Sequence, residues 1–190
     1  MTINTFIALL LFMSTPQAKI MKAPFPEPNI INHLLSWGYT AVDRPRKVEA
    51  IIIHSSYNAL TADSFSVAGV IREYKKYGVS PHYLISRHGT IYRLVKDRDI
   101  AYQAGKSRLP NGITDVNAVS IGIELINTPH DPPTAAQYKA LASLVAWLES
   151  KYPVEYVLGH KDIAPGRKTD PWNFDWKEFN RMLQAQKRLR

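Results

Sequence analysis

Two runs rich in apolar residues predict buried β-strands. Residues 49–54 read Glu-Ala-Ile-Ile-Ile-His, and residues 120–126 read Ser-Ile-Gly-Ile-Glu-Leu-Ile. Short runs rich in β-branched side chains are typical of strands that are covered on both faces. A shorter run over residues 156–158 predicts another strand, and residues 82–86 and 90–95 predict a β-hairpin around a glycine turn.

Helical spacing separates these strands. Apolar residues recur every three or four positions over residues 64–77, which predicts an amphipathic helix. Thr134 and Gln137 have the spacing of a capping box, so a second helix is predicted over residues 134–151. A last helix is predicted over residues 175–188. Strands that alternate with helices predict an α/β fold, with a central mixed β-sheet flanked by α-helices.

The N-terminal part of the chain differs from the rest. Residues 6–13 are all apolar, but a bilayer span takes about 20 residues. The run has the length of a signal-peptide core, so we predict a signal peptide over residues 1–18 and export to the periplasm or the medium. An uncleaved anchor, or a buried helix in a cytoplasmic protein, is the alternative. Pro24, Pro26 and Pro28 predict an extended arm over residues 19–38, which leaves 39–190 as one domain.

Charge and composition narrow the possible partners and metal ligands. The chain has 190 residues and a formal charge of +8, which favours an anionic partner such as nucleic acid, a membrane surface or cell-wall polymer. No nucleic-acid-binding motif accompanies the basic residues, so we predict no nucleic-acid partner. We also expect no stable membrane span and a monomer. Because the chain has no cysteine, histidine and carboxylate must hold any metal.

Two histidines and an aspartate form a candidate metal site. His54 and His160 each come at the end of a predicted strand, and Asp170 lies in the proline- and glycine-containing loop that follows His160. Neighbouring strands would bring the imidazoles together at one rim, and the loop could return the carboxylate to them. Three such ligands leave a fourth position for water, which is the pattern of catalytic zinc. Two unrelated histidines that cap strands are the alternative.

Two further charged residues are candidates for catalysis. Glu124 lies inside an apolar strand, where an unpaired carboxylate is costly to bury. It therefore either forms a structural ion pair or faces a polar groove as a general base. Lys168 comes two residues before Asp170. It could stabilise the oxyanion of a tetrahedral intermediate, or it could be a solvated surface lysine.

Four blocks of sequence carry a family resemblance. They are Ile-Ile-Ile-His at 51–54, Pro-His-Tyr-Leu-Ile at 81–85, Ser-Ile-Gly-Ile-Glu at 120–124 and Gly-His-Lys-Asp-Ile-Ala-Pro-Gly-Arg-Lys-Thr-Asp-Pro at 159–171. With these blocks, the chain from about Tyr39 to Trp176 resembles the zinc-dependent N-acetylmuramoyl-L-alanine amidases of the type-2 superfamily, which includes peptidoglycan-recognition proteins. The resemblance implies an amidase domain over residues 39–190, with its zinc in a surface groove.

The resemblance also implies roles for the candidate residues. It implies Zn²⁺ on His54, His160 and Asp170, Glu124 as the general base and Lys168 as the oxyanion stabiliser. The implied reaction is cleavage of the amide between N-acetylmuramic acid and L-alanine in peptidoglycan or a muropeptide. The alternative is a peptidoglycan-binding module without catalysis. Such modules typically lack a zinc ligand, whereas this chain keeps all three.

Two departures from the family pattern concern the groove. Where bacterial members typically have Ala-Trp-His-Ala-Gly, residues 101–105 read Ala-Tyr-Gln-Ala-Gly. We expect Gln103 to line the groove and to change substrate preference without affecting zinc binding. Trp172 replaces the glycine that usually follows the Asp-Pro pair. We predict that Trp172, Tyr57 and His82 contact substrate, with core packing or a structural hydrogen bond as the alternative.

Overall fold

The structure is a computed structural model that describes residues 25–188 of the chain. The predicted signal peptide over residues 1–18 lies outside the described residues. So does the first part of the predicted arm over residues 19–38. Within the described part, no helix is both long enough and apolar enough to cross a membrane.

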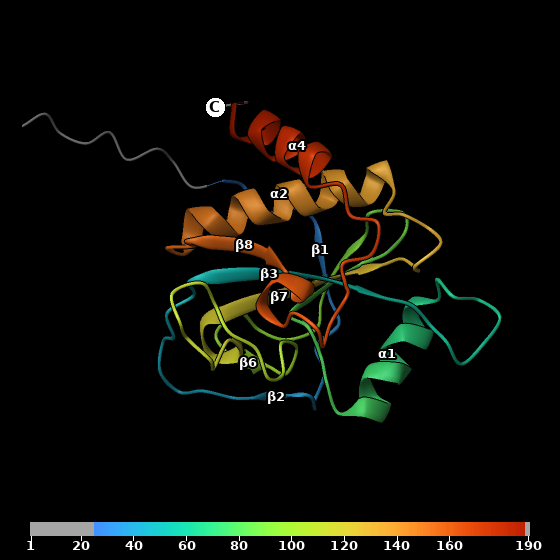
Figure 1. Cartoon of the computed structure of the whole chain (residues 1–190), viewed down its shortest axis with the longest axis horizontal. Helices are drawn as coiled ribbons and strands as arrows, with labels where there is room; N and C mark the ends of the chain where they lie inside the picture. The colour runs from blue at the N-terminus through green and yellow to red at the C-terminus, as the bar shows by residue number, and fades with distance from the viewer. Residues whose placement is uncertain (1–24, 189–190) are drawn as a thin grey trace, which may run out of the picture.

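A six-stranded mixed sheet forms the centre of the molecule (Figure 1). In spatial order its strands are β1 (Ile30–Asn32), β5 (Ile91–Arg93), β4 (Tyr83–Ile85), β7 (Ser120–Ile126), β3 (Ala50–Ser56) and β8 (Tyr156–Gly159). Neighbouring strands are parallel, except that β4 and β5 form the predicted antiparallel hairpin. Two short strands, β2 (Tyr39–Thr40) and β6 (Ile100–Ala101), form a separate antiparallel pair.

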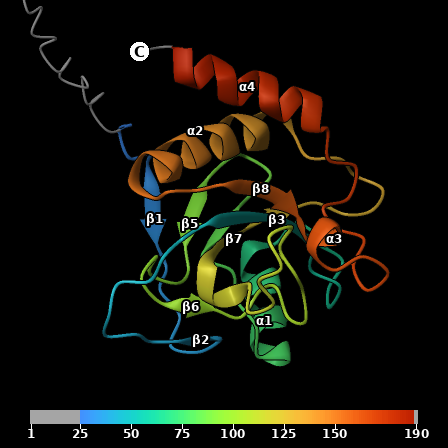
Figure 2. The ribbon, with the colours of Figure 1, turned by 60° about the vertical axis from the view of Figure 1, so that its left-hand side comes forward.

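Helices cover both faces of this sheet, which confirms the predicted α/β class. The helices α2 (Ala135–Lys151) and α4 (Trp176–Arg188) lie together on one side, and α1 (Val67–Tyr77) lies on the other (Figure 2). Two short elements complete the fold: η1 (Asn117–Val119) lies between β6 and β7, and α3 (His160–Ile163) follows β8 directly.

The alternation of side chains along the central strands divides the core into two parts. Ile51 and Ile53 of β3 pack into the cluster that includes the buried residues of α2 and α4. Ile52, between them, packs on the opposite face against residues of the loop that precedes β7. Because successive side chains in a strand point to opposite faces, His54 lies on the same face as Ile52. Glu124 is paired with His54 across the parallel ladder and shares that face.

The predicted capping box at the start of α2 is present and also anchors the helix to the sheet. The Thr134 hydroxyl accepts a hydrogen bond from the Gln137 amide at 3.1 Å, and the Thr134 amide donates to Gln137 Oε1 at 3.0 Å. The side-chain amide of Gln137 donates to the carbonyls of Ile85 and Ile126 at 3.1 and 3.0 Å. One polar residue therefore caps the helix and fixes its start against β4 and β7.

Three local features differ from the sequence-based expectations. Residues 30–32 of the predicted arm form β1, which pairs with β5 and becomes an edge strand of the sheet. The strand β3 continues past His54 to Ser56. His160 is not the last residue of a strand, because β8 ends at Gly159 and His160 begins α3. These features depend on pairing between distant segments, which a local pattern does not encode.

Candidate metal centre and active site

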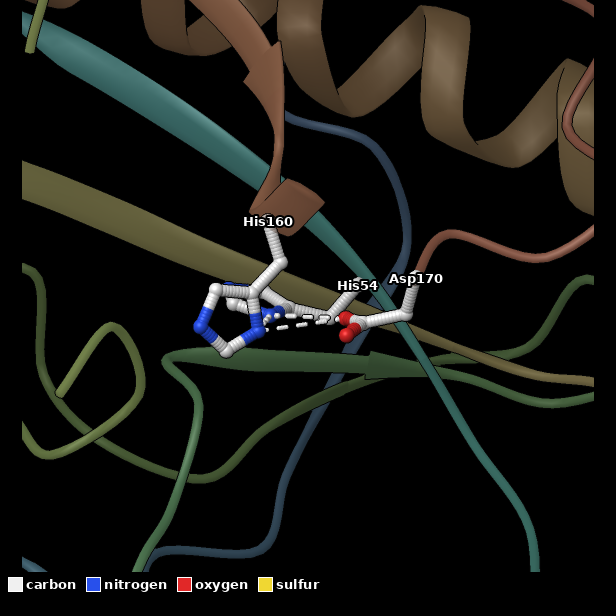
Figure 3. Close-up of side chains that lie close together, drawn as sticks. All are labelled: His54, His160 and Asp170. Atoms are coloured by element: carbon white, nitrogen blue, oxygen red, sulfur yellow. Dashed lines mark hydrogen bonds and ion pairs between the residues drawn. The ribbon is translucent and has the colours of Figure 1, made fainter. Parts of the chain in front are cut away.

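The side chains of His54, His160 and Asp170 converge on one point (Figure 3). The Nδ1 atoms of the two histidines are 2.9 Å apart, and Asp170 Oδ2 lies 3.3 Å from His54 Nδ1 and 3.2 Å from His160 Nδ1. All three residues are buried. The structure thus brings together the three residues that were expected from the sequence to form a metal site.

Adjacent parallel strands explain the meeting of the two histidines. In the register of β3 and β8, Ile53 pairs with Gly159, and each residue immediately precedes one of the histidines. Gly159 is required for close packing, since a Cβ at this position would lie 2.7 Å from Pro171 Cδ. Its amide donates to the Asp162 carboxylate at 2.7 Å, which fixes the sharp change from strand to helix.

Backbone hydrogen bonds return the loop after α3 to the histidines. The Lys161 amide donates to the Asp170 carbonyl at 2.8 Å, so the loop closes on the start of the helix. On the other side of the carboxylate, the Trp172 amide donates to Ser55 Oγ at 3.1 Å. Asp170 is therefore tied on one side to α3 and on the other to β3, next to His54.

The hydrogen-bond partners of the two histidines fit a bound cation. His54 Nε2 lies 2.5 Å from Gln103 Oε1, and His160 Nε2 lies 3.1 Å from the Ala104 carbonyl oxygen. Both partners are acceptors, so each Nε2 carries the proton and each Nδ1 presents a lone pair. Burial lowers the pKa of His54, which keeps its imidazole neutral.

Two lone pairs and a carboxylate oxygen would repel one another at these distances without a cation between them. Two imidazole nitrogens and one carboxylate oxygen are a donor set that zinc accepts, with a fourth position free. The residues present therefore fit a divalent metal such as zinc. The acceptors behind each histidine are the outer partners that usually orient metal-binding imidazoles.

Glu124 and Lys168 line the same pocket as the three candidate ligands. One carboxylate oxygen of Glu124, Oε2, is buried and has no hydrogen-bond partner among the described residues. Burial, followed by the negative charge of Asp170, raises the pKa of Glu124 to about 8, although Ser56 and Lys168 oppose the shift. A carboxyl group in this state can exchange a proton near neutral pH. Lys168 is exposed at the rim.

Two of the four predicted substrate contacts lie in the pocket lining, namely Gln103 and Trp172. Tyr57 is not part of the lining. Its ring packs edge-on against Trp172, with 5.8 Å between ring centroids, so Tyr57 contacts a lining residue without lining the pocket itself.

The prediction that His82 faces the groove is wrong. His82 is fully buried, and its Nδ1 accepts a hydrogen bond from the Gly122 amide at 3.0 Å. Its Nε2 lies 3.1 Å from the Asp99 carbonyl oxygen and 2.8 Å from Arg46 Nη2. Burial, then the charge of Arg46, lowers the pKa of His82 to about 3, so the imidazole is a neutral structural group.

Several lining residues were not identified from the sequence. They are Ser55, Tyr74, Val79, Ser80, Pro81 and Tyr102. Tyr102 adjoins Gln103 in the segment at 101–105, so the sequence does carry a signal for its position. Tyr74 is a buried residue of α1, and its hydroxyl lies 2.6 Å from Ser56 Oγ. The Ala104 carbonyl that accepts from His160 is a backbone group, so the pattern of side chains in the sequence could not predict its role.

Comparison with known proteins agrees with this geometry. The chain is 43% identical over 103 residues to the 1,6-anhydro-N-acetylmuramyl-L-alanine amidase AmpD of Enterobacter cloacae, a match that covers 53% of this chain and 54% of the relative. It is 32% identical over 155 residues to the N-acetylmuramoyl-L-alanine amidase AmiD of Escherichia coli, covering 70% of this chain and 52% of the relative. The chain thus spans about half the length of the curated relatives it matches.

Solved structures have the same fold. A selenomethionine derivative of AmpD matches with a TM-score of 0.67 and 28% identity, covering 85% of this chain and 98% of that one. The Escherichia coli AmiD complex with anhydro-N-acetylmuramic acid-L-Ala-D-γ-Glu-L-Lys matches with a TM-score of 0.62 and 27% identity, covering 76% of this chain and 65% of that one.

The relatives correct the prediction of export. The AmpD proteins of Enterobacter cloacae, Haemophilus influenzae and Escherichia coli are 40–43% identical to the matched segment, and AmpD proteins are cytoplasmic amidases. The prediction rested on the apolar run at residues 6–13, a pattern that a signal peptide shares with other apolar segments.

The matched family covers the whole candidate site. The family described as N-acetylmuramoyl-L-alanine amidase matches residues 44–173, a range that contains the three candidate ligands together with Glu124 and Lys168. With the fold and the relatives in agreement, the chain belongs to the type-2 N-acetylmuramoyl-L-alanine amidase family.

Proposed function

We propose that this chain is a zinc-dependent amidase that hydrolyses the amide between the lactyl group of N-acetylmuramic acid and L-alanine. The observation that carries the proposal is the convergence of three metal-binding side chains in the pocket that also contains Glu124 and Lys168. A structural ion pair would give Glu124 a cationic partner, whereas its Oε2 has no partner among the described residues.

In this proposal, His54, His160 and Asp170 hold the zinc through Nδ1, Nδ1 and Oδ2. When bound, zinc supplies Lewis-acid chemistry, which polarises a carbonyl group and makes water more acidic. Gln103 and Ala104 hold the outer nitrogens of the histidines, so the ligands are already oriented before the metal arrives.

Glu124 acts as the general base and then as the general acid. It accepts a proton from the attacking water and gives it to the nitrogen of L-alanine as the carbon–nitrogen bond breaks. Burial disfavours the charged carboxylate and therefore favours the protonated form that the second step needs. The ammonium group of Lys168 donates a hydrogen bond to the oxyanion that forms at the carbonyl oxygen. The products are a lactyl carboxylate and a peptide with a free amino terminus.

The relatives suggest the first substrate to test. Their names include 1,6-anhydro-N-acetylmuramyl-L-alanine amidase, and the AmiD complex contains an anhydro-muramyl peptide. We therefore propose a muropeptide with a 1,6-anhydro sugar as a substrate. Trp172 and Tyr102, which both line the pocket, offer apolar walls for the sugar or the peptide.

A digest analysed by mass spectrometry tests the proposal. Purified sacculi and an anhydro-muropeptide are incubated with the protein, with a chelator and with the chelator followed by excess zinc. We expect free stem peptides that begin with L-alanine, loss of cleavage with chelator and recovery with zinc. Binding of muropeptide without cleavage in the presence of zinc would instead identify a recognition module.

A further inference from the structure

We propose that Gln103 and Ser120 are positioning residues that select the ring nitrogen with which His54 binds metal. The inference rests on the proposed function, because it concerns the metal of the same site. It starts from the contact between His54 Nε2 and Gln103 Oε1, which are 2.5 Å apart. An expectation from sequence alone was that Gln103 affects substrate preference without affecting zinc binding.

Ser120 determines which way the amide of Gln103 points. The hydroxyl of Ser120 donates to the Val116 carbonyl oxygen at 2.6 Å, which uses its single proton. Ser120 Oγ can then only accept a hydrogen bond from Gln103, whose Nε2 lies 2.8 Å away. The amino group of Gln103 must therefore face Ser120, and its carbonyl oxygen must face His54.

This direction fixes the tautomer of His54. A carbonyl oxygen cannot donate a hydrogen bond, so the proton of the neutral imidazole must be on Nε2. The lone pair is then on Nδ1, which points toward His160 and Asp170. A chain of hydrogen bonds with one direction thus runs from His54 through Gln103 and Ser120 to the backbone at Val116.

Neighbouring residues fix the side chain and the backbone of Gln103 in place. A Cβ on Gly122 would lie 2.5 Å from Gln103 Cγ, so the bare glycine of β7 makes room for the side chain. Asn117 Oδ1 accepts hydrogen bonds from the amides of Gln103 and Ala104 at 3.2 and 2.8 Å. Because the Ala104 carbonyl accepts from His160, one short segment carries the outer partners of both histidines.

Metal affinity and the tautomer of His54 test the inference without any measurement of activity. Gln103→Leu keeps the approximate volume and removes the acceptor. We expect it to weaken zinc binding by roughly 10–100-fold, the usual effect of losing the outer partner of a metal-binding histidine. Ser120→Ala frees the amide to turn over and should weaken binding less. Gln103→Glu keeps an acceptor and should retain wild-type affinity or bind more tightly.

Ser107→Ala is the matched control. Ser107 is a buried serine four residues after Gln103 that donates to the Gly105 carbonyl oxygen, and it is not part of the chain of hydrogen bonds from His54 to Val116. Zinc dissociation constants are measured at one pH by competition with a chromophoric chelator. Long-range ¹H–¹⁵N NMR of the metal-free protein reports which nitrogen of His54 carries the proton. We expect the proton on Nε2 in the wild type and in Ser107→Ala.

Two results would overturn the inference. One is wild-type zinc affinity in Gln103→Leu, and the other is a proton on Nδ1 of His54 in the metal-free wild type. Failure of the proposed function looks different, because the unmodified protein would then fail to bind zinc or to cleave muropeptides. If Gln103→Leu does not fold, Ser120→Ala and the NMR measurement on the wild type still decide the question.

Discussion

His54 and Glu124 are direct partners in the parallel ladder between β3 and β7, so their side chains project from the same face of the sheet. The candidate metal ligand and the candidate general base are thereby fixed relative to each other by backbone hydrogen bonds rather than by a mobile loop. A change to either side chain can then be made without moving the other, which makes substitutions at this site informative.

Replacement of Glu124 by glutamine separates an enzyme from a binding module. Glu124→Gln keeps the shape of the side chain and removes the proton acceptor, so we expect kcat to fall by roughly 10²–10⁴. Zinc content should not change, because Glu124 is not one of the three converging ligands. Glu178→Gln, in the first turn of α4 and outside the pocket lining, is the matched control for the loss of a carboxylate. Near-normal turnover with a lower melting temperature would show that Glu124 is structural.

Lys168→Ala tests the oxyanion role. We expect a loss of about 10²–10³ in kcat, the scale of one oxyanion donor, with KM nearly unchanged because the ground state does not need this group. Lys168 is exposed, so the melting temperature should stay the same. Lys177→Ala removes an exposed lysine of α4 and is the control. A rise in KM with constant kcat would instead make Lys168 a substrate-binding residue.

Trp172→Gly restores the residue that the family usually has after the Asp-Pro pair. If the indole is a wall for substrate, KM for a muropeptide should rise by roughly 2–10-fold, the equivalent of one aromatic contact, and kcat should change little. Tyr57→Leu should have a smaller effect, since Tyr57 contacts the indole and does not line the pocket. Unchanged KM in Trp172→Gly would remove the ring from the substrate site.

The buried His82 should make the fold sensitive to acid. Its pKa is about 3 in the folded protein and about 6.5 in the unfolded chain, because burial and the adjacent Arg46 disfavour the imidazolium. Between these values the unfolded chain binds a proton that the folded protein does not. The free energy of unfolding should therefore fall as the pH drops from 6.5 toward 3, by up to about 1.4 kcal/mol per pH unit from this residue.

Denaturant unfolding at a series of pH values, with a chelator present throughout, measures this slope. In His82→Asn the protein should be less stable at pH 7, because the hydrogen bond toward Asp99 is lost, but the slope below pH 6.5 should be shallower. His33→Asn removes an exposed imidazole as the control. Equal slopes in the wild type and His82→Asn would contradict the assignment of His82 as a neutral buried group.

The central elements of the fold could be predicted from sequence because their signals are local. The apolar run of β7, the amphipathic spacing of α1 and the capping box of α2 are three such signals. Each is contained in one short stretch of consecutive residues. The strand β1 could not be predicted in this way. It has three residues, two of which are exposed, and it exists because it pairs with β5, about 60 positions away in the chain.

In the candidate site, too, some residues could be predicted from the sequence and others could not. His160 and Asp170 lie in one distinctive block of sequence and His54 ends another, and the structure brings the three together. His82 belongs to another matching block, yet the structure buries it beside Arg46, and no sequence pattern shows which face of a short hairpin is covered. The role of Gln103 depends on a glycine and a serine of β7, which come close to it only in the folded chain.

The zinc content and the amidase activity of the same protein samples test the central claim most directly. Metal-free protein is titrated with zinc, and cleavage of an anhydro-muropeptide is measured at each point. We expect activity to rise in proportion to bound zinc and to saturate at about one zinc per chain, and we expect His160→Ala neither to bind zinc at this level nor to cleave. Full activity in metal-free protein, or one tightly bound zinc in His160→Ala, would contradict the zinc-dependent mechanism.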